Sequence, residues 1–307
     1  MNVARRTRDR AWLPSKRSRR RWGVMLFLAP IFILIVGVLG YPLVSEVSLS
    51  LFNQSYIGVP GQFVGLDNFR QLLLQSSFWN SLLVTVEWTA GNIVVQGVLG
   101  LPVALLLKQR FWGRSIMRIL IIIPWVLPDT VVATLWQWML SSSFGIINHL
   151  LLALHLVNSP ITFLGGSLTM PTLIGVNSWE WFPFGAILLY AALGTVPEEL
   201  YEAATMDGAN AWKRFRYVSL PWLQPTLITL GLVGIVVTFN NFTLIWLMSR
   251  GGPGTATETL PLSMYETAFQ VFQVSQGAAI GVLTIVSLAV LAGLFLKANA
   301  RGLREFM

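Results

Sequence analysis

Six long runs of apolar residues, separated by polar connections, dominate the pattern of this sequence. A helix that crosses a membrane needs about 20 mostly apolar residues, and each run has that length. We therefore predict six membrane-spanning helices and an all-α polytopic membrane protein. The predicted spans are Trp22–Ser45, Phe78–Leu107, Ile119–Leu140, Pro171–Val196, Pro225–Ser249 and Gly277–Leu296.

Proline residues lie inside several of these runs. Proline removes a backbone hydrogen bond and clashes with the preceding turn, so we expect bends or local openings at these positions. Bent helices let a bundle surround a cavity instead of closing on itself. The prolines concerned are Pro30, Pro42, Pro102, Pro124, Pro128 and Pro183.

The composition supports this fold class and removes several kinds of chemistry. Hydrophobic residues make up 54% of the 307 residues and charged residues only 11%, against about 25% charged residues in a soluble domain. No cysteine is present, which excludes disulfides, thiolate zinc sites and cysteine nucleophiles. His149 and His155 are six residues apart, which is not the spacing of a helical metal pair. We predict neither a catalytic nor a metal site.

The basic residues predict how the chain crosses the membrane. Nineteen of the 21 lysines and arginines lie in the tail 1–21, in the connections after the second and fourth runs, and at the C-terminal end. Basic connections stay in the cytoplasm, so we expect both termini, including the tail 298–307, on that side. This distribution explains the net charge of +8 by topology and by contact with anionic lipid, and it argues against nucleic acid as a partner.

The connection between the fourth and fifth runs, Thr195–Leu227, is rich in local signals. Thr195 and Glu198 have the spacing of a capping box, which predicts a helix start. Gly208 is expected to redirect that helix. A second short helix is expected over Ala209–Val218, and Pro221 is expected to end it before the fifth span. Such a pair of helices suits the groove of a partner protein, but an amphipathic helix lying on the lipid surface fits the same pattern.

A resemblance decides between these two interpretations. Glu202-Ala203-Ala204, then Gly208, then Leu220-Pro221 resembles the EAA loop of the permeases of binding-protein-dependent ABC importers. In that family the loop is a coupling helix seated in a cleft of an ATPase subunit. The resemblance places the loop at residues 198–221. The residues it implies for contact with the ATPase are Glu202, Ala203, Ala204, Asp207, Gly208, Ala209, Trp212, Phe215, Leu220 and Pro221.

Further segments resemble the carbohydrate branch of the same family, of the maltose or glycerol-phosphate type. They are Pro124–Pro128, Trp179–Phe184, Leu193–Gly194, Pro197–Leu200, Gly251–Pro253 and Thr257–Thr259. The resemblance covers nearly the whole chain except residues 1–21. It implies the type I importer permease fold over residues 22–297, in the cell membrane of a prokaryote.

The energy source is expected to lie on another chain. The sequence contains no G-x-x-x-x-G-K-[ST] motif, so it has no P-loop to bind ATP phosphates, and we do not expect an enzyme. The resemblance implies two ATPase subunits that hold ATP and magnesium, a second homologous permease, and an extracytoplasmic solute-binding lipoprotein. The expected function is to form, with the second permease, a path for a sugar or sugar-like solute.

Polar and aromatic residues inside the predicted spans are candidates for the substrate path, because polar groups facing lipid are costly. Asparagine and glutamine both donate and accept hydrogen bonds, as sugar hydroxyls require. The same side chains could instead join helices to one another. The candidates are Asn240, Asn241 and Trp246 in the fifth run, Trp88, Asn92 and Gln96 in the second, and Trp181 in the fourth.

Three acids inside the spans support an alternative function. Glu87, Asp129 and Glu180 have no lysine or arginine in any predicted span to pair with. An ion-coupled secondary transporter would use such acids, but it would leave the EAA pattern unexplained. Which sugar or sugar-like solute is carried stays open at this point.

Overall fold

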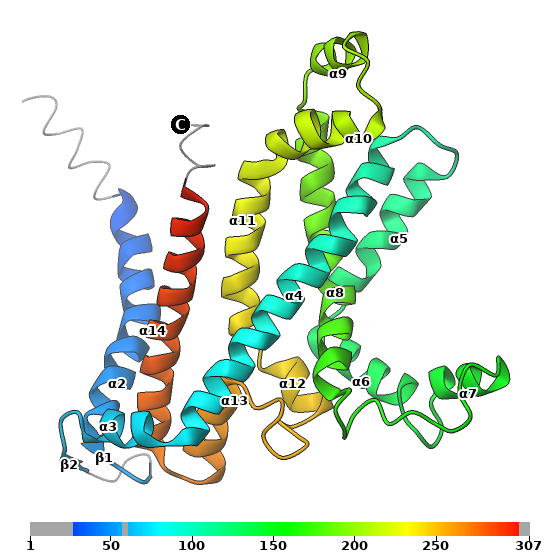
Figure 1. The fold of residues 1–307 in the computed structure, drawn as a ribbon. Coiled ribbons are helices and arrows are strands. Elements are labelled where there is room, and N and C mark those ends of the chain that lie inside the picture. The colour runs from blue at the N-terminus through cyan, green and yellow to red at the C-terminus, as the bar shows by residue number, and fades with distance from the viewer. Residues whose placement is uncertain (1–26, 57–60, 301–307) are drawn as a thin grey trace, which may run out of the picture. The chain divides into compact units, whose positions relative to one another are not determined.

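The computed structural model describes residues 27–56 and 61–300 (Figure 1). The predicted tail 1–21, the start of the first span at Trp22 and residues 301–307 lie outside the described residues. The chain divides into two units, residues 1–48 and 49–307, and each is considered by itself.

The described part of the first unit is helical throughout. A helical stretch covers Phe27–Ser50, with a mean hydropathy of 2.4. It includes a π-helical turn, η1 (Val36–Gly40), and α2 (Tyr41–Ser50), which runs on into the second unit. The predicted first span is therefore confirmed for its described residues, and its helix ends at Ser50 rather than Ser45.

The second unit is almost entirely helical. Its one small sheet pairs β1 with β2 as antiparallel strands, with Phe52 opposite Phe63. The elements are β1 (Phe52–Asn53), β2 (Gln62–Phe63), α3 (Asp67–Leu74), α4 (Ser76–Lys108), α5 (Arg114–Val126), α6 (Asp129–Met139), α7 (Ile146–Ala153), α8 (Thr169–Gly194), α9 (Glu198–Met206), α10 (Ala211–Arg214), η2 (Phe215–Ser219), α11 (Leu220–Phe239), α12 (Thr243–Met248), α13 (Leu260–Tyr265), η3 (Glu266–Gln270) and α14 (Val274–Ala298).

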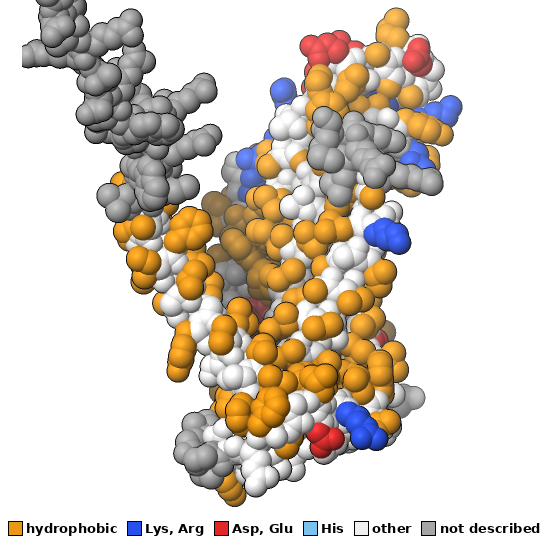
Figure 2. All heavy atoms as spheres, turned by 90° about the vertical axis from the view of Figure 1, so that its left-hand side faces the viewer, with side chains coloured by type: hydrophobic (Ala, Val, Ile, Leu, Met, Phe, Trp, Pro, Cys, Tyr) orange, Lys and Arg blue, Asp and Glu red, His pale blue; other side chains and the backbone are white. Residues whose placement is uncertain are grey.

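The helices α4, α8 and α11 pack against one another and form the centre of this unit. The backbones of α4 and α8 approach closely, because a Cβ at Gly100 would lie 3.4 Å from the backbone nitrogen of Ala186. Trp88 and Phe239 are among the largest fully buried side chains. Figure 2 shows one face, where hydrophobic side chains cover the middle of the unit and charged side chains lie mainly toward its ends.

Four helices in the described part of the chain are long and apolar enough to cross a membrane. They are Phe27–Ser50, Ser76–Lys108, Ala211–Phe239 and Val274–Ala298. The helix α8 has the length of a span, with 26 residues, but Asn177, Ser178 and Glu180 make it more polar. The bent pair α5 and α6 adds a fifth if the two helices are counted together as one broken span. Together these elements are compatible with the six predicted spans.

The third predicted span is not one continuous helix. It begins at Arg114, not Ile119, and breaks between α5 and α6, which meet at 96°. Leu127 is extended, with ψ of 139°, because the ring of Pro128 disfavours a helical conformation in the residue before it. The expected bend at the prolines is confirmed, while the expectation of one continuous helix over Ile119–Leu140 is wrong.

The fifth predicted span also differs from the structure. Its helix begins at Ala211 and ends at Phe239, and α12 follows a break at residues 240–242. Asn240 bonds back to the carbonyl of Val236 through its side chain, and the Asn241 side chain accepts the amide of Leu244. Asparagine side chains that bond to nearby backbone groups compete with the helix, so one helix over Pro225–Ser249 does not form.

Candidate functional site

The segment from α9 to η2, here called the elbow (residues 198–219), lies at one end of the second unit. Figure 1 shows α9 beyond α10 and the adjoining end of α4. The helix α9 starts at Glu198, as predicted, but Thr195 does not cap it. The helix α8 runs to Gly194, so the Thr195 hydroxyl instead bonds to the carbonyl of Ala192 at 2.8 Å. The predicted capping box is therefore wrong, although the predicted start is right.

Gly208 turns the chain after α9, as predicted. Its φ of +74° lies in the left-handed region, which side chains other than that of glycine rarely adopt. The amide of Gly208 bonds to the carbonyl of Thr205, and the amide of Ala209 bonds to that of Ala204. These two bonds form a Schellman motif, which closes a helix end with a fixed geometry.

The second helix of the elbow begins at Ala211, later than predicted, and does not stop before the next span. The helix α10 starts after Asn210, whose side chain accepts the amide of Lys213 at 2.9 Å. It passes through η2 directly into α11, so neither the helix Ala209–Val218 nor the stop at Pro221 is correct. The wider turn of a π-helix suits this join, because Pro221 has no amide to donate to an α-helical bond.

Three side-chain contacts fix the elbow: one lies within it, one joins it to α4, and one joins the residues that flank it on either side. The Tyr201 hydroxyl of α9 lies 2.9 Å from the Ser219 hydroxyl of η2. The Lys108 ammonium at the end of α4 lies 3.9 Å from the centre of the Tyr201 ring, which is a cation–π geometry. The Trp222 indole of α11 donates to the Thr195 hydroxyl at 3.1 Å. Movement of α9 is therefore linked to α4 and, through η2, to α11.

The outer surface of the elbow is apolar as well as charged. The exposed fraction is 88% for Met206, 68% for Trp212 and 75% for Tyr217, and the sequence analysis had not singled out Met206 and Tyr217. Exposed apolar side chains on one surface mark a site for contact with another molecule. Of the predicted contact residues, Glu202, Ala203, Asp207, Gly208, Trp212 and Pro221 are exposed, and Ala204, Ala209, Phe215 and Leu220 are half-buried.

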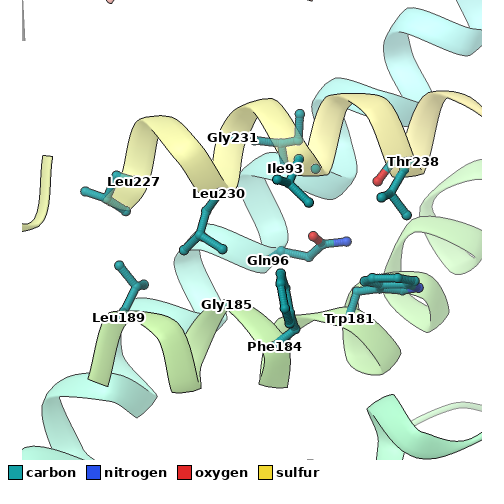
Figure 3. A pocket seen from close by; sticks show the side chains of 14 residues that line it. Ile93, Gln96, Trp181, Phe184, Gly185, Leu189, Leu227, Leu230, Gly231 and Thr238 are labelled. Atoms are coloured by element: carbon teal, nitrogen blue, oxygen red, sulfur yellow. The ribbon is translucent and has the colours of Figure 1, made fainter. Parts of the chain in front are cut away.

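A cavity of about 250 Å³ lies between α4, α8 and α11 (Figure 3). Gln96 of α4 points into it, and its amide nitrogen is buried without a hydrogen-bond partner among the described residues. Trp181 and Phe184 of α8 and Thr238 of α11 line the same space. Flat aromatic rings beside an unsatisfied amide can hold a ligand that has both apolar faces and polar edges.

A chain of hydrogen-bonded polar side chains lies near the cavity, and its member Asn92 is one turn from Gln96 on α4. Asn177 of α8 donates to the side chain of Asn92 at 2.7 Å, and Ser178 donates to it at 3.2 Å. Asn241, after α11, donates to Asn177 at 3.4 Å and to Asp129 at 3.3 Å. These bonds join α4, α8, the start of α6 and the break after α11.

The acids inside the spans lie in two different settings. Glu180 is only 2% exposed and interacts with Asp129, and one of its carboxyl oxygens has no hydrogen-bond partner in the described part of the chain. Glu87 is exposed on the surface of α4. A carboxyl group at membrane depth requires protein or water beside it.

The structure separates the predicted substrate residues into groups. Gln96 and Trp181 line the cavity, and Asn92 and Asn241 belong to the adjoining polar chain. Trp88 is fully buried and bonds to a backbone carbonyl, which makes it part of the core.

Two predicted substrate residues lie away from the cavity. The exposed side chain of Asn240 bonds to its own helix. Trp246 packs in an aromatic cluster with Phe242 and Tyr265.

Sequence reasoning missed Asn177 and Phe184 as members of the site. Asn177 is a polar residue in an apolar run, the same signal that had identified Asn92. Phe184 carried no such signal, since a phenylalanine in a membrane helix usually faces lipid or core. Its position at the cavity follows only from the packing of α8 against α4 and α11.

The fold has a close counterpart among solved structures. It matches a bacterial ABC transporter involved in the import of the acidic polysaccharide alginate with a TM-score of 0.80, covering 93% of this chain and 98% of that one at 22% identity. The chain is 31% identical to the trehalose/maltose transport system permease protein MalF of Thermococcus litoralis, over 89% of this chain and 92% of the relative. It is 34% identical to the diacetylchitobiose uptake system permease protein DasB of Streptomyces coelicolor, over 89% of this chain and 85% of that relative.

The family model described as the inner membrane component of binding-protein-dependent transport systems matches residues 96–305. That range includes the elbow and most of the helices that line the cavity. The helices, the elbow and this match agree, and the chain is therefore a multi-pass membrane protein that belongs to the family of inner membrane components of binding-protein-dependent transport systems.

Proposed function

We propose that this chain is one permease subunit of an ATP-driven importer, and that it carries a saccharide through the cavity between α4, α8 and α11. The single observation that carries this proposal is the lining of that cavity, with Gln96 unsatisfied beside Trp181 and Phe184. The cavity is on the helices that surround the predicted path, and the elbow is joined to the same helices. A second homologous permease is expected to complete the path.

The chemistry of the cavity favours a sugar. The faces of a sugar ring carry C–H groups that pack on aromatic rings, and its rim carries hydroxyls that need donors and acceptors. Trp181 and Phe184 offer the rings, and Gln96 and Thr238 offer polar groups. The relatives named for trehalose, maltose and diacetylchitobiose support the same class of substrate.

The elbow is the expected entry point for mechanical force. We infer that its apolar surface around Trp212 and Met206 seats in a cleft of a separate ATPase subunit, which holds ATP and magnesium. The Schellman turn at Gly208 and the contacts of Tyr201 make the elbow stiff. Closure of two ATPase subunits would then rock this bundle against its partner, a two-state rigid-body change. This arrangement places the elbow and both termini in the cytoplasm and the binding protein on the opposite side.

Uptake by the reconstituted importer tests the proposal. The chain is assembled with the second permease, the ATPases and the binding protein in proteoliposomes, and uptake of labelled maltose, trehalose and diacetylchitobiose is measured. Trp181→Ala should lower uptake strongly while Trp181→Phe retains most of it, because an aromatic face remains. Trp138→Ala, on an exposed part of α6, is the matched control and should retain full uptake.

The energy source separates the importer from an ion-coupled transporter. Uptake should require ATP inside the vesicles and should persist when an ionophore collapses the ion gradients. Uptake that ignores ATP and stops with the ionophore would rule the proposed function out. Full uptake by Trp181→Ala with normal ATP dependence would keep the importer but remove the substrate site from this cavity.

A further inference from the structure

Two arginines of α5 share one acceptor on α8. The guanidinium groups of Arg114 and Arg118 each donate to the hydroxyl of Tyr190 at 2.6 Å. Both also lie over the Tyr190 ring, 5.3 and 4.7 Å from its centre. Two like charges are thus held side by side around one hydroxyl group. The start of α5 lies at the end of the unit that carries the elbow (Figure 1).

Most of the hydrogen-bond donors of these arginines lack acceptors. The Nε atoms of Arg114 and Arg118 are buried and have no partner within the described ranges 27–56 and 61–300. No carboxylate of the described residues forms an ion pair with either guanidinium, and their only hydrogen bonds there are those to Tyr190. A pair of cations in this position calls for an anion with several acceptor oxygens.

A hollow of about 420 Å³ lies at the start of α5, and Arg114 of the pair lines it. Arg110, Arg114 and Ser115 contribute polar groups to its lining. The first turn of α5 also faces the hollow, and no side chain caps it, since Gly113 precedes the helix with φ of +85°. Free amides at a helix start add to an anion site that basic side chains already form.

The rim of the hollow is apolar, which indicates what kind of anion fits. Trp112 is 97% exposed and Ile116 60% exposed, and both line the hollow. From here α5 continues into its apolar run with Ile119 and Leu120 also exposed. Tryptophan beside arginine at the end of an apolar helix marks the level of lipid headgroups. A ligand at this site would meet cations with its polar part and apolar side chains with the rest.

We propose that the hollow formed by residues 110–116 binds the phosphate of an anionic phospholipid. Arg110 and Arg114 contact the phosphate oxygens, with Ser115 and the first amides of α5 as further donors. Tyr190 is a positioning residue that holds the two guanidinium groups of α5 in place. The acyl chains lie along Ile116 and the exposed side of α5. Basic pockets between membrane helices bind anionic headgroups in this manner.

Fluorescence quenching tests the site in the assembled importer. The fluorescence of Trp112 is obtained by subtracting the fluorescence of Trp112→Phe from that of the natural protein. It is measured in phosphatidylcholine vesicles that contain either brominated phosphatidylglycerol or brominated phosphatidylcholine. The anionic lipid should quench Trp112 more strongly at equal fractions. Arg114→Gln should lower that preference about fivefold, as expected for one base at an anionic surface. Arg114→Lys should retain most of the preference.

Controls distinguish a built site from general surface charge and from free phosphate. Lys297→Gln removes one positive charge from the last turn of α14 and should leave the preference unchanged. Added inorganic phosphate should not displace the brominated lipid. Equal quenching by both lipids in the natural protein, an equal loss in Lys297→Gln, or displacement by inorganic phosphate would each overturn the proposal. The comparison of the two brominated lipids needs no arginine variant. The proposal can therefore be contradicted even if an arginine variant folds poorly.

Discussion

The indole N–H of Trp88 in α4 donates a 2.9 Å hydrogen bond to the backbone carbonyl of Thr238, in the last turn of α11. The Trp88 side chain is fully buried. This bond fixes the second span to the point where α11 ends, next to the polar chain of Asn92, Asn177 and Asn241. The position of the cavity therefore depends on a contact between residues 150 positions apart.

Replacing Trp88 tests this contact. Trp88→Phe should destabilise the assembled protein by about 1–3 kcal/mol, from the lost hydrogen bond and the space left by the smaller ring. Thermal unfolding of the purified complex measures the change. Trp138→Phe, at a position 62% exposed, should stay within about 0.5 kcal/mol of the natural protein. Equal losses in both variants would show that the bond to Thr238 adds no stability.

Glycine is predicted to be required at position 208 because of the backbone conformation there, and not because a larger side chain would lack space. A Cβ at this position would meet nothing within 4 Å, but φ is +74°. Gly208→Leu should add about 1–2 kcal/mol of backbone strain and uncouple ATP hydrolysis from uptake. Gly208→Asn should keep most of the coupling, because asparagine tolerates the left-handed region. Solute imported per ATP hydrolysed is the measurement, and normal coupling in Gly208→Leu would contradict a stiff elbow.

Replacing Gln96 is expected to impair transport without lowering the stability of the protein. Its buried amide nitrogen has no partner in the described part of the chain, so Gln96→Leu removes an unsatisfied polar group. The unfolding temperature should stay equal or rise, while KM for uptake should increase roughly threefold to tenfold from the loss of one hydrogen bond to the solute. A variant with unchanged KM would show that Gln96 does not touch the substrate.

Two glycines of α14 offer a matched pair for packing. A Cβ at Gly277 would lie 2.6 Å from the Cβ of Ala268 and 3.0 Å from its Cα, whereas a Cβ at Gly293 would meet nothing within 4 Å. Gly277→Ala should destabilise the protein by about 1–3 kcal/mol because η3 must move. Gly293→Ala should be neutral or slightly stabilising, because alanine is the better helix former. Equal unfolding temperatures for the two variants would contradict the close packing of α14 on η3.

The pH dependence of stability is expected to include Glu266, which lies outside the membrane-spanning helices. Burial raises the pKa of its carboxyl above the ordinary 4.5, and the negative charge of Glu258 adds to the rise. Its stabilising effect is then complete below pH 4.5 and is lost as pH rises through the higher folded pKa.

Glu266→Gln should therefore remove the decrease in stability with rising pH, and Glu258→Gln should make that decrease smaller. Unfolding temperatures measured across pH provide the test. An unchanged pH dependence in Glu266→Gln would show that another group causes it.

The apolar runs predicted the approximate place of the four helices that are long and apolar enough to cross a membrane in the described part of the chain, because about 20 consecutive apolar residues have no other stable location. Local signals also predicted the start of α9 at Glu198 and the turn at Gly208, since both depend on neighbouring residues alone. The ends of helices were less certain. Pro221 was expected to stop a helix that in fact continues through η2 into α11.

The sequence by itself determined that this protein crosses a membrane several times, that a helix starts at Glu198 and that the chain turns at Gly208, because hydropathy and short-range backbone rules act within a few turns. Only the tertiary structure decided which polar residues meet. Asn92, Gln96 and Trp88 share one helix, yet one bonds to other helices, one faces a cavity and one is core. Side-chain surroundings depend on helices far apart in the chain, and no local pattern specifies how those helices pack.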